Sequence, residues 1–189
     1  MNVAIYSGSF NPLHIGHLAI IKYMIEVAGF DMVYLIVSPK NPLKESISSN
    51  SGIARFNAAV EAVSRHFAIT DVARVHVDDI ELTMPEPHYT IRTLDALRAR
   101  EPRHDFTFVM GADNLADIRR WREYARILAE FGVAVYPRTG FDLEAIRQDL
   151  LNENPAYKID IINAPVVNIS STQIREAVSR GEDISHLLM

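Results

Sequence analysis

Short apolar runs alternate with amphipathic stretches along the whole chain. Runs of β-branched and aromatic residues predict strands, and apolar positions three or four residues apart predict helices. The apolar runs predict strands at Val3–Tyr6, Met32–Val37, Val72–Val77, Phe106–Met110, Val133–Tyr136 and Ile159–Ile162. The helical spacing predicts helices at Ile15–Ala28, Ser51–Phe67, Thr90–Arg100, Leu143–Leu151 and Ser171–Ser179.

This alternation indicates the fold class, because strands separated by helices pair in parallel. We expect an α/β fold, a Rossmann-like doubly wound parallel sheet of five to six strands with helices on both faces. The length of 189 residues fits a single domain over 1–189. The helix at 51–67 is expected to turn one apolar face inward, formed by Ile53, Phe56, Val60, Val63 and Phe67.

Ligands in such folds bind beyond the carboxyl ends of the strands. The segments that follow the predicted strands hold histidines, hydroxyls and lone basic residues, and we expect them to converge on one edge of the sheet. These segments are Ser7–His17, Ser38–Asn50, Asp78–Tyr89, Gly111–Asn114, Pro137–Gly140 and Asn168–Thr172.

The first of these segments contains Gly8–His17, G-S-F-N-P-L-H-I-G-H. Gly8 follows a strand directly and lets the backbone approach a ligand closely. A helix that begins near Ile15 places His14 just before it and His17 in its first turn. Because a helix N-terminus attracts anions, two imidazoles there predict a cradle for phosphate oxygens.

Other interpretations of the histidines are a metal pair or a helix cap. A metal pair needs one or two further ligands, and a cap accounts for one histidine only. Gly16 lowers helix stability, so a close approach by ligand or backbone is expected there. Phe10 is expected to pack into the core and brace the turn.

The last segment continues into a helix as Asn168–Arg175, N-I-S-S-T-Q-I-R. A helix cap needs one hydroxyl, from Ser170 or Ser171. The remaining hydroxyls, with Thr172 and the helix N-terminus, are candidates for binding β- and γ-phosphates. Arg175 lies one turn further along and could reach the phosphates or pair on the surface.

The run S-G-S-F-N-P-L-H-I-G-H-L at 7–18 resembles G-G-T-F-D-P-x-H-x-G-H-L of bacterial nicotinate-nucleotide adenylyltransferases, in the cytidylyltransferase-like nucleotidyltransferase superfamily. The run I-S-S-T-Q-I-R at 169–175 is similar to the family's I-S-S-T-x-I-R. The chain departs at Ser7, Ser9 and Asn11, which stand for Gly, Thr and Asp. Asn11 brings no carboxylate to the phosphates.

Two further stretches carry the resemblance. D-I-E-L at 79–82 with Y-T-I-R-T-L at 89–94 is similar to the family's D-I-E-L and Y-T-I-x-T-L, which implies a pyridine pocket at Tyr89 and Thr90. The stretch 106–121 resembles a strand followed by G-A/T-D and a tryptophan. It implies that Gly111 approaches the nucleotide and that Asp113 contacts ribose hydroxyls. For Trp121, stacking on the pyridine and packing in the core both stay open.

The resemblance implies an adenylyltransferase that joins ATP and nicotinate mononucleotide to give nicotinate adenine dinucleotide and pyrophosphate, in NAD biosynthesis. It implies His14 and His17 as catalytic residues and Mg²⁺ bridging the ATP phosphates, with no metal site made by the protein. The implied ATP contacts are Gly8, Ser9, Phe10, Gly16, Gly111, Asp113, Ser170, Ser171, Thr172 and Arg175. The implied acceptor contacts are Lys44, Tyr89, Thr90, Trp121 and Arg138.

Alternatives remain within this picture. The acceptor could be nicotinamide mononucleotide or phosphopantetheine, and the chain could be a non-catalytic nucleotide-binding module. Lys44 could equally be a solvated loop lysine, and Arg138 matches the family's R-P-G by residue but not by neighbour order. A dehydrogenase is excluded at the motif level, because no G-x-G-x-x-G follows the first strand.

Composition narrows the picture further. The 24 acidic and 19 basic residues give a net charge of -5, which disfavours a nucleic-acid partner. The absence of cysteine excludes disulfides and thiolate catalysis. No apolar run is long enough for a membrane span and no secretory signal is seen, so we expect a cytoplasmic protein. A homo-oligomer is left open.

Overall fold

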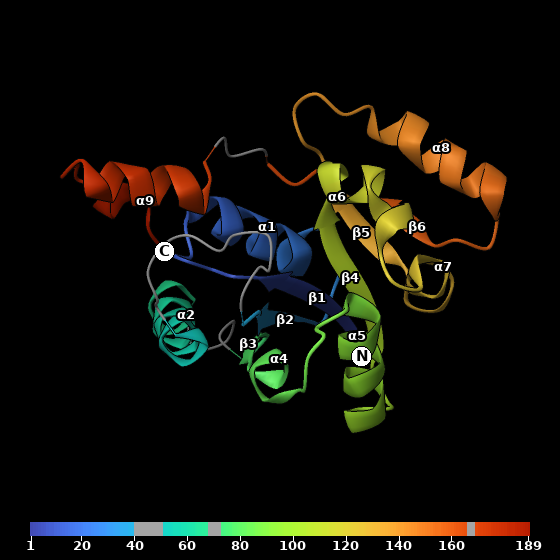
Figure 1. The fold of residues 1–189 in the computed structure, drawn as a ribbon, viewed down its shortest axis with the longest axis horizontal. Helices are drawn as coiled ribbons and strands as arrows, with labels where there is room; N and C mark the ends of the chain where they lie inside the picture. The colour runs from blue at the N-terminus through green and yellow to red at the C-terminus, as the bar shows by residue number, and fades with distance from the viewer. Residues whose placement is uncertain (40–50, 68–72, 166–168) are drawn as a thin grey trace.

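The computed structural model describes residues 1–39, 51–67, 73–165 and 169–189. Its centre is a six-stranded sheet in which every neighbouring pair is parallel (Figure 1). Across the sheet the strands are β3 (Val75–Asp78), β2 (Met32–Val37), β1 (Asn2–Gly8), β4 (Asp105–Gly111), β5 (Val133–Tyr136) and β6 (Ile159–Ile161). The strand order reverses between β1 and β4, so the ligand crevice of such a fold lies beyond their carboxyl ends.

Helices and tighter turns connect the strands (Figure 1). The α-helices are α1 (Ile15–Glu26), α2 (Gly52–His66), α4 (Ile80–Thr83), α5 (Thr90–Arg100), α6 (Ala112–Ala116), α7 (Tyr124–Arg126), α8 (Leu143–Glu153) and α9 (Ser171–Ser179). The described residues also form two 3-10 turns, Ile118–Arg120 and Ser185–Leu187, and one π-helical turn, Ile127–Phe131.

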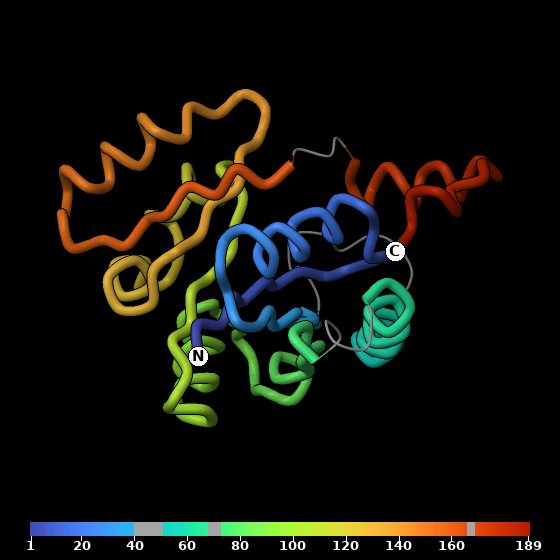
Figure 2. The backbone as a smooth tube through the Cα atoms, turned by 180° about the vertical axis from the view of Figure 1, so that it is seen from behind, coloured from blue at the N-terminus to red at the C-terminus, as the bar shows by residue number. Residues whose placement is uncertain are grey.

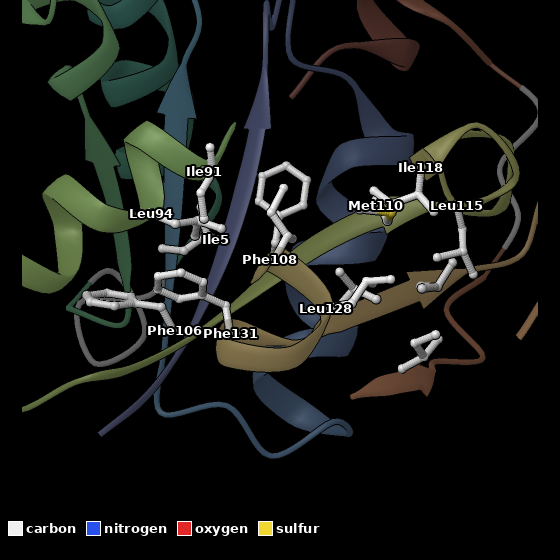
Figure 3. Packing of buried hydrophobic residues seen from close by; sticks show 14 of the residues in the cluster. Ile5, Ile91, Leu94, Phe106, Phe108, Met110, Leu115, Ile118, Leu128 and Phe131 are labelled. Carbon is white, nitrogen blue, oxygen red and sulfur yellow. The ribbon is translucent and has the colours of Figure 1, made fainter. Parts of the chain in front are cut away.

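Two apolar clusters cover the two faces of the sheet, because successive strand residues point to opposite sides. Val3 and Ile5 of β1 belong to the cluster under α5 and α8, whereas Ala4 and Tyr6 belong to the cluster under α1 and α2. Figure 3 shows Ile5 and Phe108 of the sheet packed among residues from α5 and from the turn that ends at Phe131. Figure 2 shows α1 lying across the opposite face.

The structure confirms the predicted fold class. Every predicted strand and helix is present, with bounds that differ by three residues at most, and Val72, the predicted start of the third strand, lies outside the described residues. The short helices α4 and α6 and the turns between Ile118 and Phe131 were not predicted. No helix in the described parts of the chain has the length and apolarity to cross a bilayer.

The predicted inward face of α2 is partly wrong. Ile53 is 68% exposed and Val60 41% exposed, while Arg55, Ala59 and Ala62 are buried. The helix instead turns inward the face that carries Arg55, whose guanidinium donates hydrogen bonds to backbone carbonyls of two neighbouring loops.

The last residues of the described chain return to the start of α1. Leu188 forms an isolated antiparallel bridge with His14, and Met189 is buried in the cluster under α1. In Figure 1 the C-terminal end lies beside the loop that follows β1. Segments from opposite ends of the sequence therefore meet at the carboxyl end of β1.

Candidate active site

The loop after β1 and the start of α9 are held together by two hydrogen bonds. The hydroxyl of Ser171 donates to the carbonyl of Pro12 at 3.1 Å, and Nη1 of Arg175 donates to the carbonyl of Asn11 at 2.7 Å. The first and last predicted segments therefore do converge at one edge of the sheet.

The two histidines form a reciprocal cap at the N-terminus of α1. The N–H of Gly16 donates to Nδ1 of His14 at 3.2 Å, and the N–H of His14 donates to Nδ1 of His17 at 3.2 Å. The two rings lie with their centroids 3.7 Å apart. The interpretation that capping accounts for only one histidine was wrong, because each ring accepts a bond from the backbone of this turn.

This cap fixes the tautomer of both rings. A nitrogen that accepts a hydrogen bond carries no proton, so the proton of each neutral ring lies on Nε2. Burial, together with the charge of Arg138, lowers the pKa of His14 to about 4. Burial, His14 and Arg138 lower the pKa of His17 to about 3. Near neutral pH each histidine is therefore an uncharged Nε2–H donor.

Glycines in this loop make room for its own aromatic side chains. A Cβ on Gly8 would lie 3.1 Å from the ring of Phe10, and a Cβ on Gly16 would lie 3.0 Å from the ring of His14. The predicted close approach at Gly16 is thus made by an imidazole. Phe10 is buried, as expected, and its ring lies 5.2 Å from that of His17.

The hydroxyls at the start of α9 each have a partner within the protein. Ser170 is the N-cap: its Oγ accepts from the N–H of Gln173, whose side chain accepts from the N–H of Ser170. Thr172 Oγ1 accepts a bond from Nη2 of Arg175 at 3.0 Å. Capping therefore uses one hydroxyl. Ser171 connects α9 to the first loop, and Thr172 binds Arg175 within the same helix.

Asp113 and Arg138 lie together at the end of β4 and β5. Their nearest charged atoms are 3.7 Å apart, and the guanidinium of Arg138 lies 5.1 Å from the centre of the Tyr136 ring. A Cβ on Gly111 would meet Oδ1 of Asp113, so the glycine leaves room for this carboxylate, although the exposed side chain of Asp113 could also shift. The positive charge of Arg138 adds to burial in lowering the pKa of both histidines.

The predicted acceptor contacts are spread around this edge. Tyr89 is the exposed N-cap residue of α5, and Thr90 is its first residue. Trp121 is partly buried and packs edge-on against Phe108, with centroids 5.9 Å apart. Lys44 lies outside the described residues.

Sequence reasoning missed the buried polar side chains of Arg55, Thr93 and Glu81. Arg55 donates to the carbonyls of Ser9 and Pro39, and Thr93 of α5 donates to the buried Glu81 carboxylate of α4 at 2.8 Å. A signal for Arg55 existed, because Arg55, Ala59, Ala62 and Val63 also follow helical spacing.

Comparison with known proteins connects this geometry to a family. The chain matches the Cytidylyltransferase-like family over residues 5–177. It is 37% identical over 188 residues to a probable nicotinate-nucleotide adenylyltransferase of Flavobacterium johnsoniae, covering 100% of this chain and 92% of that protein. A protein of the same name from Bacteroides fragilis is 38% identical over 184 residues, covering 97% of this chain and 85% of the relative.

Solved structures share the fold. The nicotinic acid mononucleotide adenylyltransferase of Plasmodium falciparum, solved in complex with APC, superposes with a TM-score of 0.78 at 22% identity, covering 99% of this chain and 90% of that one. The same protein complexed with NaAD gives a TM-score of 0.77, covering 97% and 86%. The chain therefore belongs to the cytidylyltransferase-like family, as a nucleotidyltransferase of its nicotinate-nucleotide adenylyltransferase group.

Proposed function

We propose that this chain transfers the adenylyl group of ATP to nicotinate mononucleotide and releases pyrophosphate. The observation that carries the proposal is the meeting of two helix N-termini, those of α1 and α9, around the His14–His17 pair. Helix N-termini and N–H donors are suited to a polyphosphate. The names of the curated relatives support nicotinate mononucleotide as the acceptor.

The chemistry is an in-line displacement at the α-phosphorus. A phosphate oxygen of the acceptor forms the new P–O bond as the bond to the leaving pyrophosphate breaks. That oxygen is already anionic near neutral pH, so the protein provides positioning and charge stabilisation and no general base.

The histidines supply donors for this step. Each offers one Nε2–H, and the reciprocal cap fixes the orientation of both rings before substrate binds. Donors that are fixed in advance stabilise charge that develops in the transition state. We assign His14 and His17 to the oxygens of the α- and β-phosphates.

The leaving group is assigned to the start of α9. Ser171, Thr172 and Arg175 lie next to the first loop, and the guanidinium supplies positive charge for the pyrophosphate. On the acceptor side we retain Tyr89, Thr90 and Trp121 as pyridine contacts, by the family resemblance.

Enzymes of this kind generally use a divalent metal ion. Within the described residues no three His, Asp or Glu side chains are grouped to hold one. The donor set around His14 and His17 fits a nucleotide whose phosphates carry Mg²⁺, and such an ion would supply further charge neutralisation at those phosphates. Cytoplasmic location and the absence of nucleic-acid partners stay predictions from sequence, and the oligomeric state stays open.

Pyrophosphate release from ATP and Mg²⁺ tests the proposal, with nicotinate mononucleotide, nicotinamide mononucleotide and phosphopantetheine offered separately. We expect the highest kcat/KM with nicotinate mononucleotide. A higher kcat/KM with nicotinamide mononucleotide or phosphopantetheine would identify that molecule as the acceptor instead. No pyrophosphate release with any of the three would favour the non-catalytic binding module.

His17→Ala tests the site. Removing one such donor lowers turnover by roughly 100- to 1,000-fold. His66→Ala, at the end of α2, is the matched control and should retain wild-type turnover. A folded His17→Ala protein at the wild-type rate would contradict the assigned site.

A further inference from the structure

The first turn of α2 contains a buried arginine that the helix itself does not favour. Arg55 is only 6% exposed, and burial lowers the pKa of its guanidinium. A cation in the first turn faces the positive end of the helix dipole. Burying a charge is also unfavourable unless hydrogen bonds compensate.

The hydrogen bonds of this guanidinium join two loops. Nη1 of Arg55 donates to the carbonyl of Ser9 at 2.5 Å, and Nη2 donates to the carbonyl of Pro39. Ser9 follows β1 and Pro39 follows β2, so one side chain of α2 bridges the exits of two adjacent strands.

The bridge begins where the sheet stops. The last backbone bond between these strands runs from the N–H of Ser38 to the carbonyl of Gly8 at 3.0 Å. The next residue on each strand is Ser9 or Pro39, and the same guanidinium binds the carbonyls of both. Arg55 therefore continues the connection between the strands by one further residue on each.

The bond to Ser9 also restrains the residue that supports His17. The Ser9 carbonyl belongs to the rigid peptide plane that joins Ser9 to Phe10. Rotation of that plane changes φ of Phe10, which is 44° and lies in the left-handed region. The ring of Phe10 packs edge-on against His17, with centroids 5.2 Å apart.

We propose that Arg55 is a positioning residue for adenylyl transfer, which fixes the Ser9–Phe10 peptide and through Phe10 the imidazole of His17. The proposal rests on the proposed function for its kinetic readout. Arg55 does not touch substrate in this scheme. Its planar fork of donors spans two carbonyls, which a lysine ammonium on a flexible stem does not reproduce.

The first test compares Arg55→Lys and Arg55→Ala with wild type. We expect both to lower kcat by about 100-fold with little change in either KM, because a misplacement of about 1 Å in a catalytic group has effects of that size. Arg65→Ala, on the same helix with an exposed side chain paired to Glu61, is the control and should retain wild-type kcat. Millimolar guanidinium should restore part of the activity of Arg55→Ala, and methylammonium should not.

A second readout does not depend on activity. The imidazole ¹H and ¹⁵N nuclei of His17 lie beside the Phe10 ring, so their chemical shifts depend on the position of that ring. These resonances should shift in Arg55→Ala and stay unchanged in Arg65→Ala. If the wild-type protein transfers no adenylyl group, the proposed function fails, while these resonances still test the Arg55–Phe10–His17 connection.

Three outcomes would overturn the proposal. They are wild-type kcat in Arg55→Lys, unshifted His17 resonances in a folded Arg55 variant, and a raised KM with unchanged kcat, which would make Arg55 a substrate contact. If Arg55→Ala does not fold, the kcat and the His17 resonances of Arg55→Lys test the proposal by themselves.

Discussion

The backbone N–H of His14 donates to Nδ1 of His17 across 3.2 Å, while the His14 ring accepts from Gly16 in the same turn. In each histidine, Nδ1 thus accepts a backbone hydrogen bond and Nε2 carries the proton of the neutral ring. In the proposed function, capping and phosphate binding use different atoms of the same two rings, so suitable substitutions can separate the two roles.

The variant His14→Asn separates the capping role of His14 from its proposed role in phosphate binding. Asparagine is a strong N-cap residue, so we expect the unfolding free energy to stay within about 1 kcal/mol of wild type. The variant has no Nε2–H, and turnover should fall roughly 100- to 1,000-fold. Urea unfolding and pyrophosphate release measure the two effects. Equal activity in His14→Asn and wild type would leave His14 with a capping role only.

Lowering the pH should destabilise the fold through the same pair. The folded-state pKa values of about 4 for His14 and about 3 for His17 lie below the ordinary value of 6.5, so the unfolded chain binds more protons. This contribution to stability is complete above pH 6.5 and is lost as the pH falls towards 4 and 3. Urea unfolding at pH 7, 6 and 5 should show a falling free energy.

The double variant His14→Asn/His17→Gln is the control for that titration. It has a conventional capping box and no imidazole in the first turn. Its unfolding free energy should fall less steeply than that of wild type between pH 7 and 5. Parallel curves for the two proteins would contradict the depressed pKa values.

Asp78→Ala should be destabilising. The buried Asp78 carboxylate accepts bonds from Arg100 and from the N–H of Ile80, and these bonds with His76 hold its pKa below the usual range although burial opposes this. The variant leaves the buried N–H of Ile80 without its acceptor, which costs about 1–3 kcal/mol, while Arg100 is 40% exposed and keeps its pair with Glu101. Glu61→Ala breaks the exposed pair with Arg65 and should cost under about 1 kcal/mol. Similar thermal shifts for the two variants would be the contrary result.

Met189→Ala should weaken both the fold and the site. Its side chain is buried in the cluster under α1, next to the bridge between Leu188 and His14. Loss of a buried methionine side chain costs about 2–5 kcal/mol. Thermal unfolding and kcat should both decrease, whereas Val178→Ala, at an exposed position of α9, should change neither. Unchanged kcat in Met189→Ala would separate this segment from the site.

Much of the fold follows from sequence because its strands are short apolar runs. Met32–Val37 and Val133–Tyr136 were predicted to the residue, since polar, glycine or proline positions bound both runs. Helices α4 and α6 were missed because four and five residues are too few to show a helical period. The rotation of α2 was missed because its apolar pattern fits two faces, and the choice depends on a side chain bound to distant carbonyls.

The candidate site, too, has features that the sequence predicted and features that it did not. Loop positions after parallel strands placed the histidines and the start of α9 at one edge. The reciprocal cap was not predictable from spacing, because it depends on which ring nitrogen faces the backbone. The contact of Arg138 with Asp113 depends on where the ends of β4 and β5 lie relative to each other, which only the sheet defines.

The bond between Arg175 and Asn11 spans 164 residues of sequence, and that between Ser171 and Pro12 spans 159. During synthesis every strand of the sheet is translated before these partners of the first loop. A chain that stops short of α9 therefore lacks the partners of the first loop, and with them part of the proposed phosphate site. Adenylyl transfer should begin only after α9 has emerged, so a partly made chain would not compete for ATP.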